Sequence, residues 1–189
     1  MGGASLEALP PAALPEIAFA GRSNVGKSSL VNALTGRKTL AKASNTPGRT
    51  REINFFNLAE RLMLVDLPGY GYAKAPKKEV ARWTRLVKSY LSGRPSLRRV
   101  CLLIDSRHGF GKGDAEIMDM LDDAAVTYQL IFTKSDKVKA SGLMQVTDAA
   151  YALIKRHPAA HPHIIVTSSE KKDGIEELRE ELEAMAIRT

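Results

Sequence analysis

The chain has 189 residues, of which 44% are hydrophobic, and its 28 Lys and Arg against 21 Asp and Glu give a net charge of +7. This apolar content excludes a disordered chain, and no apolar run approaches the roughly 18–20 residues that a membrane-spanning helix needs. We therefore expect one domain with a full hydrophobic core, no membrane partner, and a basic face that favours a polyanion.

Short apolar runs alternate along the chain with stretches of helical periodicity. Apolar runs typical of strands lie at 17–20, 53–58, 62–65, 100–104, 128–132 and 164–166, and helical stretches lie at about 27–36, 78–92, 114–123, 143–156 and 174–186. The alternation predicts a three-layer α/β fold with a six-stranded, mostly parallel sheet and ligands at the carboxyl ends of the strands. Only the turn Ala59-Glu60 joins the second and third strands, so we expect one antiparallel edge strand.

The predicted domain organisation is simple. Residues 1–14, which include Pro10-Pro11, are interpreted as a flexible arm, and residues 15–189 as a single domain. The one cysteine, Cys101, lies inside an apolar run and has no partner for an internal disulfide. A lone core thiol is typical of a reducing compartment, so we expect a cytoplasmic protein, and we expect it to be a monomer.

The most specific motif is a phosphate-binding loop of the pattern G-x-x-x-x-G-K-[ST]. It comprises Gly21, Arg22, Ser23, Asn24, Val25, Gly26, Lys27 and Ser28. An apolar run precedes it and a helical stretch follows, and this strand-to-helix context lets backbone N–H groups surround a polyphosphate. We expect Lys27 to lie along the β and γ oxygens and the Ser28 hydroxyl to bind Mg²⁺ directly.

A second motif follows the third predicted strand and consists of Asp66, Leu67, Pro68 and Gly69. An aspartate at the tip of a buried strand beside a phosphate-binding loop can hold Mg²⁺ through a water molecule. The amide of Gly69 can approach a γ-phosphate because no side chain blocks it.

Two further segments have residues suited to binding the base of a nucleotide. The first, Thr133, Lys134, Ser135 and Asp136, follows the fifth predicted strand. The Asp136 carboxylate can accept two hydrogen bonds from guanine, whereas adenine would leave it unpaired, and the Lys134 stem can cover the base. The second, Thr167, Ser168 and Ser169, follows the last strand, and its backbone amides can reach the guanine carbonyl.

In this order, the four segments resemble the G1, G3, G4 and G5 boxes of a translation-factor-type GTPase. The G2 element should be a threonine between the first helix and the second strand, and we choose Thr50 as the second direct Mg²⁺ ligand, with Thr46 as the alternative. The remaining GTP-binding residues of that segment are predicted to be Gly48, Arg49, Arg51 and Glu52.

The longer strings GRSNVGKSSL, TPGRT followed by INFF, DLPGYGYA and TKSD resemble the EngB/YsxC (YihA) family, bacterial members of the TrmE-Era-EngA-EngB-Septin-like GTPases. The resemblance covers the chain from about Pro15 to the C-terminal helix. It implies a Ras-like P-loop fold, Mg²⁺-dependent hydrolysis of GTP to GDP, a switch function in large ribosomal subunit assembly, and a link to cell division and septation. The G4 segment begins with Thr133, where most GTPases carry Asn.

The expected catalytic set is Lys27, Asn24, Thr50 and Gly69. Ras-like proteins carry a water-orienting Gln directly after the G3 glycine. Here that residue is Tyr70, which has no amide, so we predict slow intrinsic hydrolysis. Related GTPases with this loop use an Asn to hold K⁺ near the phosphates, which implies K⁺ as an activator bound by Asn24; a plain loop-shaping role is the alternative.

Basic residues concentrate between residues 37 and 99, where fifteen Lys and Arg face four Asp and Glu. We predict that the ribosomal subunit or its rRNA contacts Lys74, Lys77, Lys78, Arg82 and Arg85, and a merely solvated basic helix is the alternative. Tyr70 and Tyr72 either stack on RNA bases or pack against the switch.

Two other functions stay open at this point. One is a P-loop small-molecule kinase, which would have no need of a guanine-reading Asp136. The other is a nucleotide-gated RNA-binding module with negligible hydrolysis, which the tyrosine at position 70 keeps open.

Overall fold

A computed structural model describes residues 2–3, 9–36, 53–71 and 77–187, with the backbone alone described for residues 2–3, 77–80, 82 and 83. Within these ranges the strands are β1 (Gly2–Gly3), β2 (Glu16–Gly21), β3 (Ile53–Leu58), β4 (Leu62–Asp66), β5 (Leu97–Asp105), β6 (Tyr128–Thr133) and β7 (Ile165–Val166). The helices are α1 (Lys27–Thr35), α2 (Lys77–Gly93), α3 (Lys112–Asp123), α4 (Ala140–Ile154) and α5 (Ile175–Glu183), with a short 3₁₀ helix at Ser135–Lys137.

The strands form one sheet in the order β1-β3-β4-β2-β5-β6-β7. The five strands β4, β2, β5, β6 and β7 pair in parallel, and β3 pairs with β4 in the antiparallel direction, as the sequence predicts. Ala59 and Glu60 take left-handed backbone conformations in the turn between β3 and β4, which suits the twist of a tight hairpin. Beyond this six-stranded plan, the two residues of β1 pair with β3.

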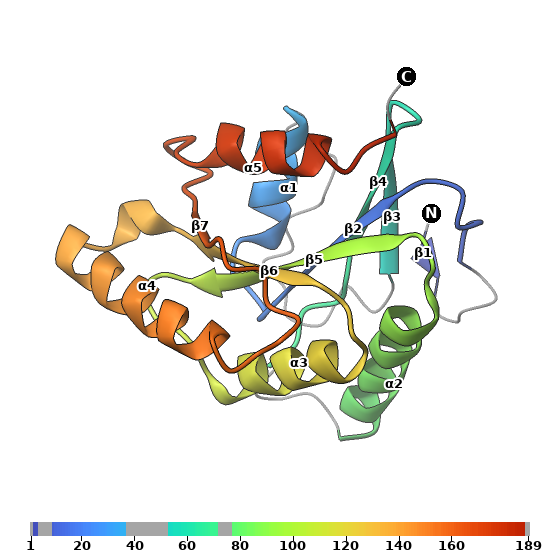
Figure 1. Ribbon diagram of the computed structural model, residues 1–189, viewed down its shortest axis with the longest axis horizontal. Coiled ribbons are helices and arrows are strands. Elements are labelled where there is room, and N and C mark those ends of the chain that lie inside the picture. Colours follow the sequence, from blue (N-terminus) through green and yellow to red (C-terminus); the bar gives the residue numbers. More distant parts are fainter. Residues whose placement is uncertain (1, 4–8, 37–52, 72–76, 188–189) are drawn as a thin grey trace.

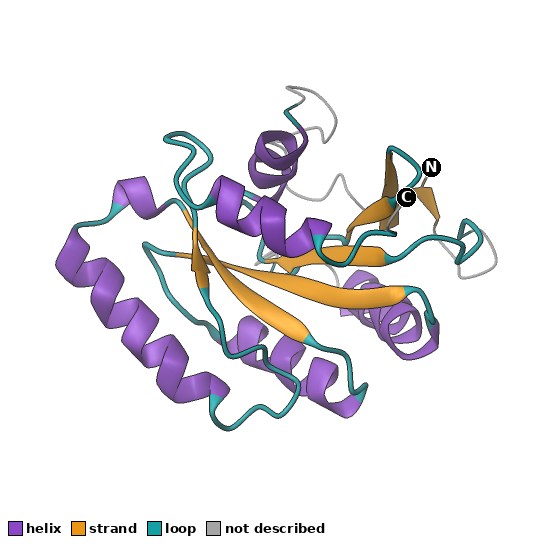
Figure 2. Ribbon diagram, turned by 45° about the horizontal axis from the view of Figure 1, so that its top comes forward, coloured by secondary structure: helices purple, strands orange, loops and turns teal. Residues whose placement is uncertain are grey.

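Helices cover both faces of the sheet, as predicted for a three-layer fold. Helices α1 and α5 lie on one face and α2, α3 and α4 on the other (Figure 1). Figure 2 shows the twisted sheet as the middle layer between them. None of the described helices is long and apolar enough to cross a membrane.

The two layers of helices explain why the central strands are apolar throughout. Every residue of β2 is buried, and successive side chains alternate between two apolar clusters. Ala18 and Ala20 face α2, α3 and α4, whereas Ile17 and Phe19 face α1 and α5. Cys101 is fully buried on the second face, and burial raises the pKa of its thiol to about 12, which fits the predicted core role.

A cluster of buried polar side chains anchors the first residue of β2. Arg94 forms an ion pair with Glu16, with 2.6 Å between Nη2 and Oε1, and also donates to the Pro10 carbonyl at 2.7 Å. Tyr90 donates its hydroxyl to the other Glu16 oxygen at 2.9 Å, and Arg94 stacks over the ring of Phe55. The boundary predicted at residue 14 remains a prediction.

Candidate nucleotide-binding site

The predicted phosphate-binding loop begins where β2 ends and stops where α1 starts. Gly26 is the N-cap residue of α1 and has φ 104°, a left-handed conformation that favours glycine. Asn24 also has positive φ, at 62°. No side chain caps the N-terminus of α1, so its first N–H groups face the loop with the positive end of the helix dipole. This geometry suits a bound anion.

The loop lies at the point where the strand order reverses. Because β4 and β5 flank β2, the carboxyl ends of three neighbouring strands meet beside the loop. There Lys27 forms an ion pair with Asp66 at the end of β4. Only 11% of the Lys27 side chain and 8% of the Asp66 side chain are exposed, so the pair neutralises two charges in a largely buried position.

The segment after β6 is joined to the phosphate-binding loop by two side chains. The Thr133 hydroxyl donates to the Val25 carbonyl at 2.6 Å. Lys134 donates its ammonium group to the Asn24 carbonyl at 2.5 Å, and its stem passes over Gly26, with Cε 3.5 Å from the position that a Cβ would take there. The predicted G1 and G4 segments are therefore one assembly.

Asp105, at the end of β5, supports Lys134 and was not predicted from the sequence. Its Oδ2 lies 2.9 Å from the Lys134 ammonium, and Arg107 donates two side-chain hydrogen bonds to the same carboxylate. Burial raises the pKa of Asp105, but the hydrogen bonds from Arg107 and Lys134 outweigh burial and hold the pKa below its usual value. The sequence feature that could have identified Asp105 is its position, because it ends a buried strand as Asp66 does.

The predicted G4 and G5 segments also meet. Asp136 accepts a 2.7 Å hydrogen bond from the Ser168 hydroxyl on Oδ1, and its Oδ2 lies 3.0 Å from the Lys137 ammonium. The Ser168 bond first, and Lys137 second, hold the pKa of Asp136 below its usual value, so the carboxylate stays ionised. Thr167 anchors the second segment, because both its amide and its hydroxyl donate to the Phe132 carbonyl.

Tyr70 follows the predicted G3 segment and lies inside the protein. Leu67 and Pro68 of that segment are buried, Gly69 is partly exposed, and Tyr70 is 5% exposed. Tyr70 therefore packs against the neighbouring structure rather than presenting a free ring to RNA. Its hydroxyl donates to Asp114 on α3 at 2.7 Å, a contact that the sequence analysis did not anticipate.

The structure thus brings together the predicted residues at the ends of β2, β4, β6 and β7. Several others lie outside the described residues: Thr46, Gly48, Arg49, Thr50, Arg51, Glu52, Tyr72 and Lys74. The backbone of Lys77, Lys78 and Arg82 is helical within α2, and the Arg85 side chain is exposed.

Comparison with known proteins gives a consistent result. A family model described as "50S ribosome-binding GTPase" matches residues 16–134. A "Probable GTP-binding protein EngB" from Rhodospirillum rubrum is 61% identical over 191 residues, covering 98% of this chain and 83% of that relative. One of the same name from Cereibacter sphaeroides is 60% identical over 178 residues, covering 94% of this chain and 82% of the relative.

Two solved structures share the fold. A crystal structure of "a probable GTP-binding protein engB" matches with a TM-score of 0.69 at 24% identity, covering 89% of this chain and 98% of the other. A structure of Era in complex with MgGDPNP and nucleotides 1506-1542 of 16S ribosomal RNA matches with a TM-score of 0.71 at 22% identity, covering 94% and 58%.

Proposed function

The chain belongs to the EngB family of GTP-binding proteins, and from this premise we propose that it hydrolyses GTP to GDP and acts as a switch in assembly of the large ribosomal subunit. The family's link to cell division and septation is part of the same proposal. The observation that supports it is the meeting of a phosphate-binding loop, Asp66 and Asp136 at one edge of the sheet. Membership of a GTPase family argues against a small-molecule kinase.

The phosphate end of the site is suited to a magnesium nucleotide. The buried Lys27–Asp66 pair offers a cation for the β and γ oxygens and a carboxylate that would hold Mg²⁺ through water. Ser28 and Thr50 are the proposed direct ligands, since hydroxyl oxygens are hard donors that this ion accepts. When bound, Mg²⁺ would neutralise charge on the phosphates. Lys27 and Asp66 would then exchange their mutual contact for these new partners.

The base end of the site is suited to guanine. Ser168 and Lys137 keep Asp136 ionised, which is the form that accepts hydrogen bonds from the guanine N1–H and 2-amino group. Lys134 crosses the loop where its stem would cover the base. Adenine offers neither donor, and it would leave the Asp136 carboxylate facing the base unpaired.

Slow intrinsic hydrolysis is part of the proposal. The Tyr70 hydroxyl is engaged by Asp114, so the residue after Gly69 does not orient an attacking water. The proposed catalytic groups are Lys27, Thr50 and Gly69, with K⁺ held beside Asn24 as the activator. Asn24 is exposed in a left-handed turn of the loop, which leaves its side chain accessible to such an ion.

The proposed partner is the large ribosomal subunit or its rRNA. The matching family is described as ribosome-binding, and the structural neighbour Era was crystallised with ribosomal RNA. In this chain the basic excess lies between residues 37 and 99, the part of the sequence that holds Thr50 and Gly69, and it includes the exposed Arg85 on α2. The cytoplasm, where ribosomes assemble, is the expected location, and the protein would act there as a monomer.

Nucleotide binding followed by sedimentation with ribosomal subunits tests the proposal. Fluorescent GDP and GTP should bind and ATP should not, GDP should accumulate slowly from GTP, and KCl should accelerate this more than NaCl. The protein should sediment with the large subunit in the GTP state and not in the GDP state. GTP-dependent sedimentation without GDP formation would favour the nucleotide-gated module instead, and sedimentation with neither nucleotide would contradict the ribosomal role.

A further inference from the structure

Tyr70 joins two parts of the molecule that are distant in the sequence. Its backbone pairs with the phosphate-binding loop: the Tyr70 carbonyl accepts from the Ser23 amide at 2.9 Å, and the Tyr70 amide donates to the Gly21 carbonyl at 3.3 Å. Its side chain points to α3 instead. The residue directly after Gly69 is therefore held by the loop on one side and by a helix on the other.

The contact with α3 is a buried hydrogen bond to a charged group. Asp114 is 0% exposed, and its Oδ1 accepts from the Tyr70 hydroxyl at 2.7 Å. Its other oxygen accepts from the Gly111 amide at 2.7 Å, which caps the start of α3. Burial first, and the Asp114 charge second, raise the pKa of Tyr70, so the hydroxyl keeps its proton and remains the donor.

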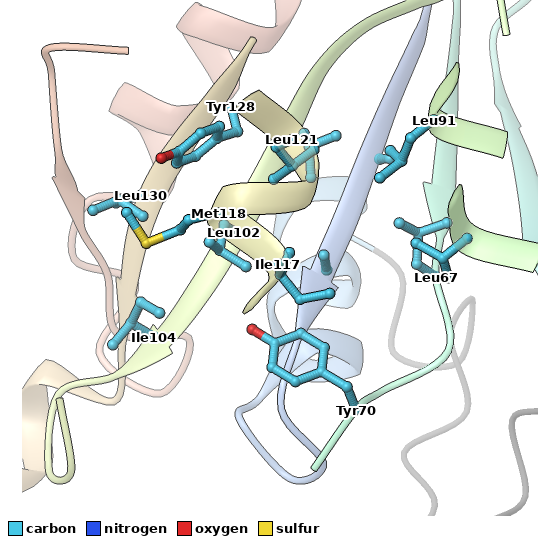
Figure 3. Packing of buried hydrophobic residues seen from close by; sticks show 14 of the residues in the cluster. Leu67, Tyr70, Leu91, Leu102, Ile104, Ile117, Met118, Leu121, Tyr128 and Leu130 are labelled. Atoms are coloured by element: carbon cyan, nitrogen blue, oxygen red, sulfur yellow. The ribbon is translucent and has the colours of Figure 1, made fainter. Parts of the chain in front are cut away.

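The surrounding residues fix the ring in this position. The ring lies beside Ile117 at one end of the apolar cluster (Figure 3). A Cβ at Gly113 would lie 3.3 Å from Tyr70 Cδ2, so a glycine there gives the ring room. Arg22 of the phosphate-binding loop borders the same place, with Nη1 3.0 Å from the position of a Cβ at Gly111.

We propose that Tyr70 and Asp114 are positioning residues that hold Gly69 against the phosphate-binding loop and thereby couple recognition of the γ-phosphate to α3. This inference rests on the proposed GTPase function, in which the Gly69 amide contacts the γ-phosphate. Gly69 has no side chain with which to anchor itself, and the residue directly after it is bonded both to the loop and to α3. GDP has no γ-phosphate to contact this amide, so loss of the Tyr70–Asp114 bond should lower the affinity for GTP and not the affinity for GDP.

Removal of the hydroxyl alone tests the coupling. Tyr70→Phe keeps the ring and deletes the bond to Asp114, and we expect the affinity for a non-hydrolysable GTP analogue to fall about three- to tenfold while the GDP affinity changes less than about twofold. Asp114→Asn keeps an oxygen for the Gly111 amide but turns an NH₂ group toward the Tyr70 hydroxyl, which can then no longer donate its proton to residue 114. The ratio of GTP to GDP affinity should therefore fall by a smaller factor than in Tyr70→Phe. In the double variant the two losses should not add, because both act on the same interaction.

The chain offers a matched control. Tyr90 also donates its hydroxyl to a buried carboxylate, Glu16, at 2.9 Å, but at the opposite end of β2. Tyr90→Phe should therefore lower the melting temperature without changing the ratio of GTP to GDP affinity.

The outcomes separate this inference from the proposed function. Equal effects of Tyr70→Phe and Tyr90→Phe on the affinity ratio would overturn the inference and reduce the Tyr70–Asp114 bond to a packing contact. Wild-type protein that binds neither nucleotide would overturn the proposed function and this inference with it. Normal binding with an unchanged ratio in Tyr70→Phe and Asp114→Asn would overturn the inference alone.

Discussion

The Thr133 hydroxyl and the Val25 carbonyl form a 2.6 Å hydrogen bond between two buried residues, and this bond ties the end of β6 to the phosphate-binding loop. The same hydroxyl lies 3.3 Å from the Ile104 carbonyl at the end of β5. One small side chain therefore holds the loop against two strands. A threonine at the start of this segment, where most GTPases carry asparagine, still connects the base-binding and phosphate-binding segments.

Thr133→Val tests whether the hydrogen bond, rather than the volume of the side chain, stabilises this connection. Valine has almost the same shape but no donor, so the buried Val25 carbonyl would lose a partner, and the free energy of unfolding should fall by about 1–3 kcal/mol. GDP and GTP affinities should fall together, because both nucleotides use the loop. Urea unfolding and nucleotide titration measure the two effects. Thr133→Ser, which keeps the hydroxyl, is the control, and a valine variant as stable as wild type would contradict the assignment.

Base selection should depend on Asp136. In Asp136→Asn the amide oxygen can still accept from Ser168, but the new NH₂ group would face a guanine donor. It would instead pair with the second carbonyl of xanthine, so the preference should change from GTP to XTP. Competition of GTP, XTP and ATP against a fluorescent guanine nucleotide measures this. A variant that still prefers GTP to XTP would show that Asp136 does not read the base.

The sequence predicted which candidate residues lie together at the strand ends. In a parallel sheet flanked by helices, the carboxyl ends of the strands share one edge, so the sequence pattern groups Asp66, Asp136 and Ser168 there. The antiparallel β3–β4 pair followed from the same logic, because a two-residue turn leaves no room for a crossover.

Contacts between distant helices and loops could not be read in this way. Tyr70 and Asp114 are 44 positions apart, and no periodicity relates them, so stacking on RNA and packing against the switch were equally compatible with the sequence. The sequence around Asp114 does contain a pattern that is typical of one of its two contacts. Asp114 stands three residues after Gly111, the spacing at which an acidic side chain caps a helix start, but such a pattern does not name a second partner.

The pH dependence of stability should report on Asp105. Arg107 and Lys134 lower its pKa in the folded protein, whereas an unfolded aspartate has a pKa of about 3.9. The Asp105 carboxylate therefore contributes stability above about pH 4. As the pH falls below that value, the unfolded chain binds a proton that the native carboxylate does not, and this contribution is lost.

Asp105→Asn should lower stability at neutral pH and flatten the curve of unfolding free energy against pH below about pH 4. Urea unfolding at a series of pH values measures both changes. Arg107→Gln should alter the curve in the same direction but less, because Lys134 remains beside the carboxylate. An Asp105→Asn curve that runs parallel to wild type at all pH values would contradict the assigned cause.

The basic surface of α2 gives the last prediction. If Arg82 and Arg85 contact rRNA phosphates, Arg82→Glu combined with Arg85→Glu should abolish association with the large subunit and leave nucleotide affinity unchanged. Arg85 is exposed, and its Nε donates to the Ala81 carbonyl of its own helix at 3.4 Å, so charge reversal there should not disturb the core. Each lost phosphate contact should reduce the slope of log affinity against log salt by about one unit.

Lys155→Glu combined with Arg156→Glu provides the matched control for this change in charge. Both residues are exposed where α4 ends, on a different helix from Arg82 and Arg85, and the net charge falls by the same amount. Co-sedimentation at several KCl concentrations should therefore separate the two double variants. Equal loss of association in both double variants would assign the effect to overall charge. Full association of the α2 variant with an unchanged salt slope would make its basic residues ordinary solvated surface, because phosphate contacts made by them would have to appear in that slope.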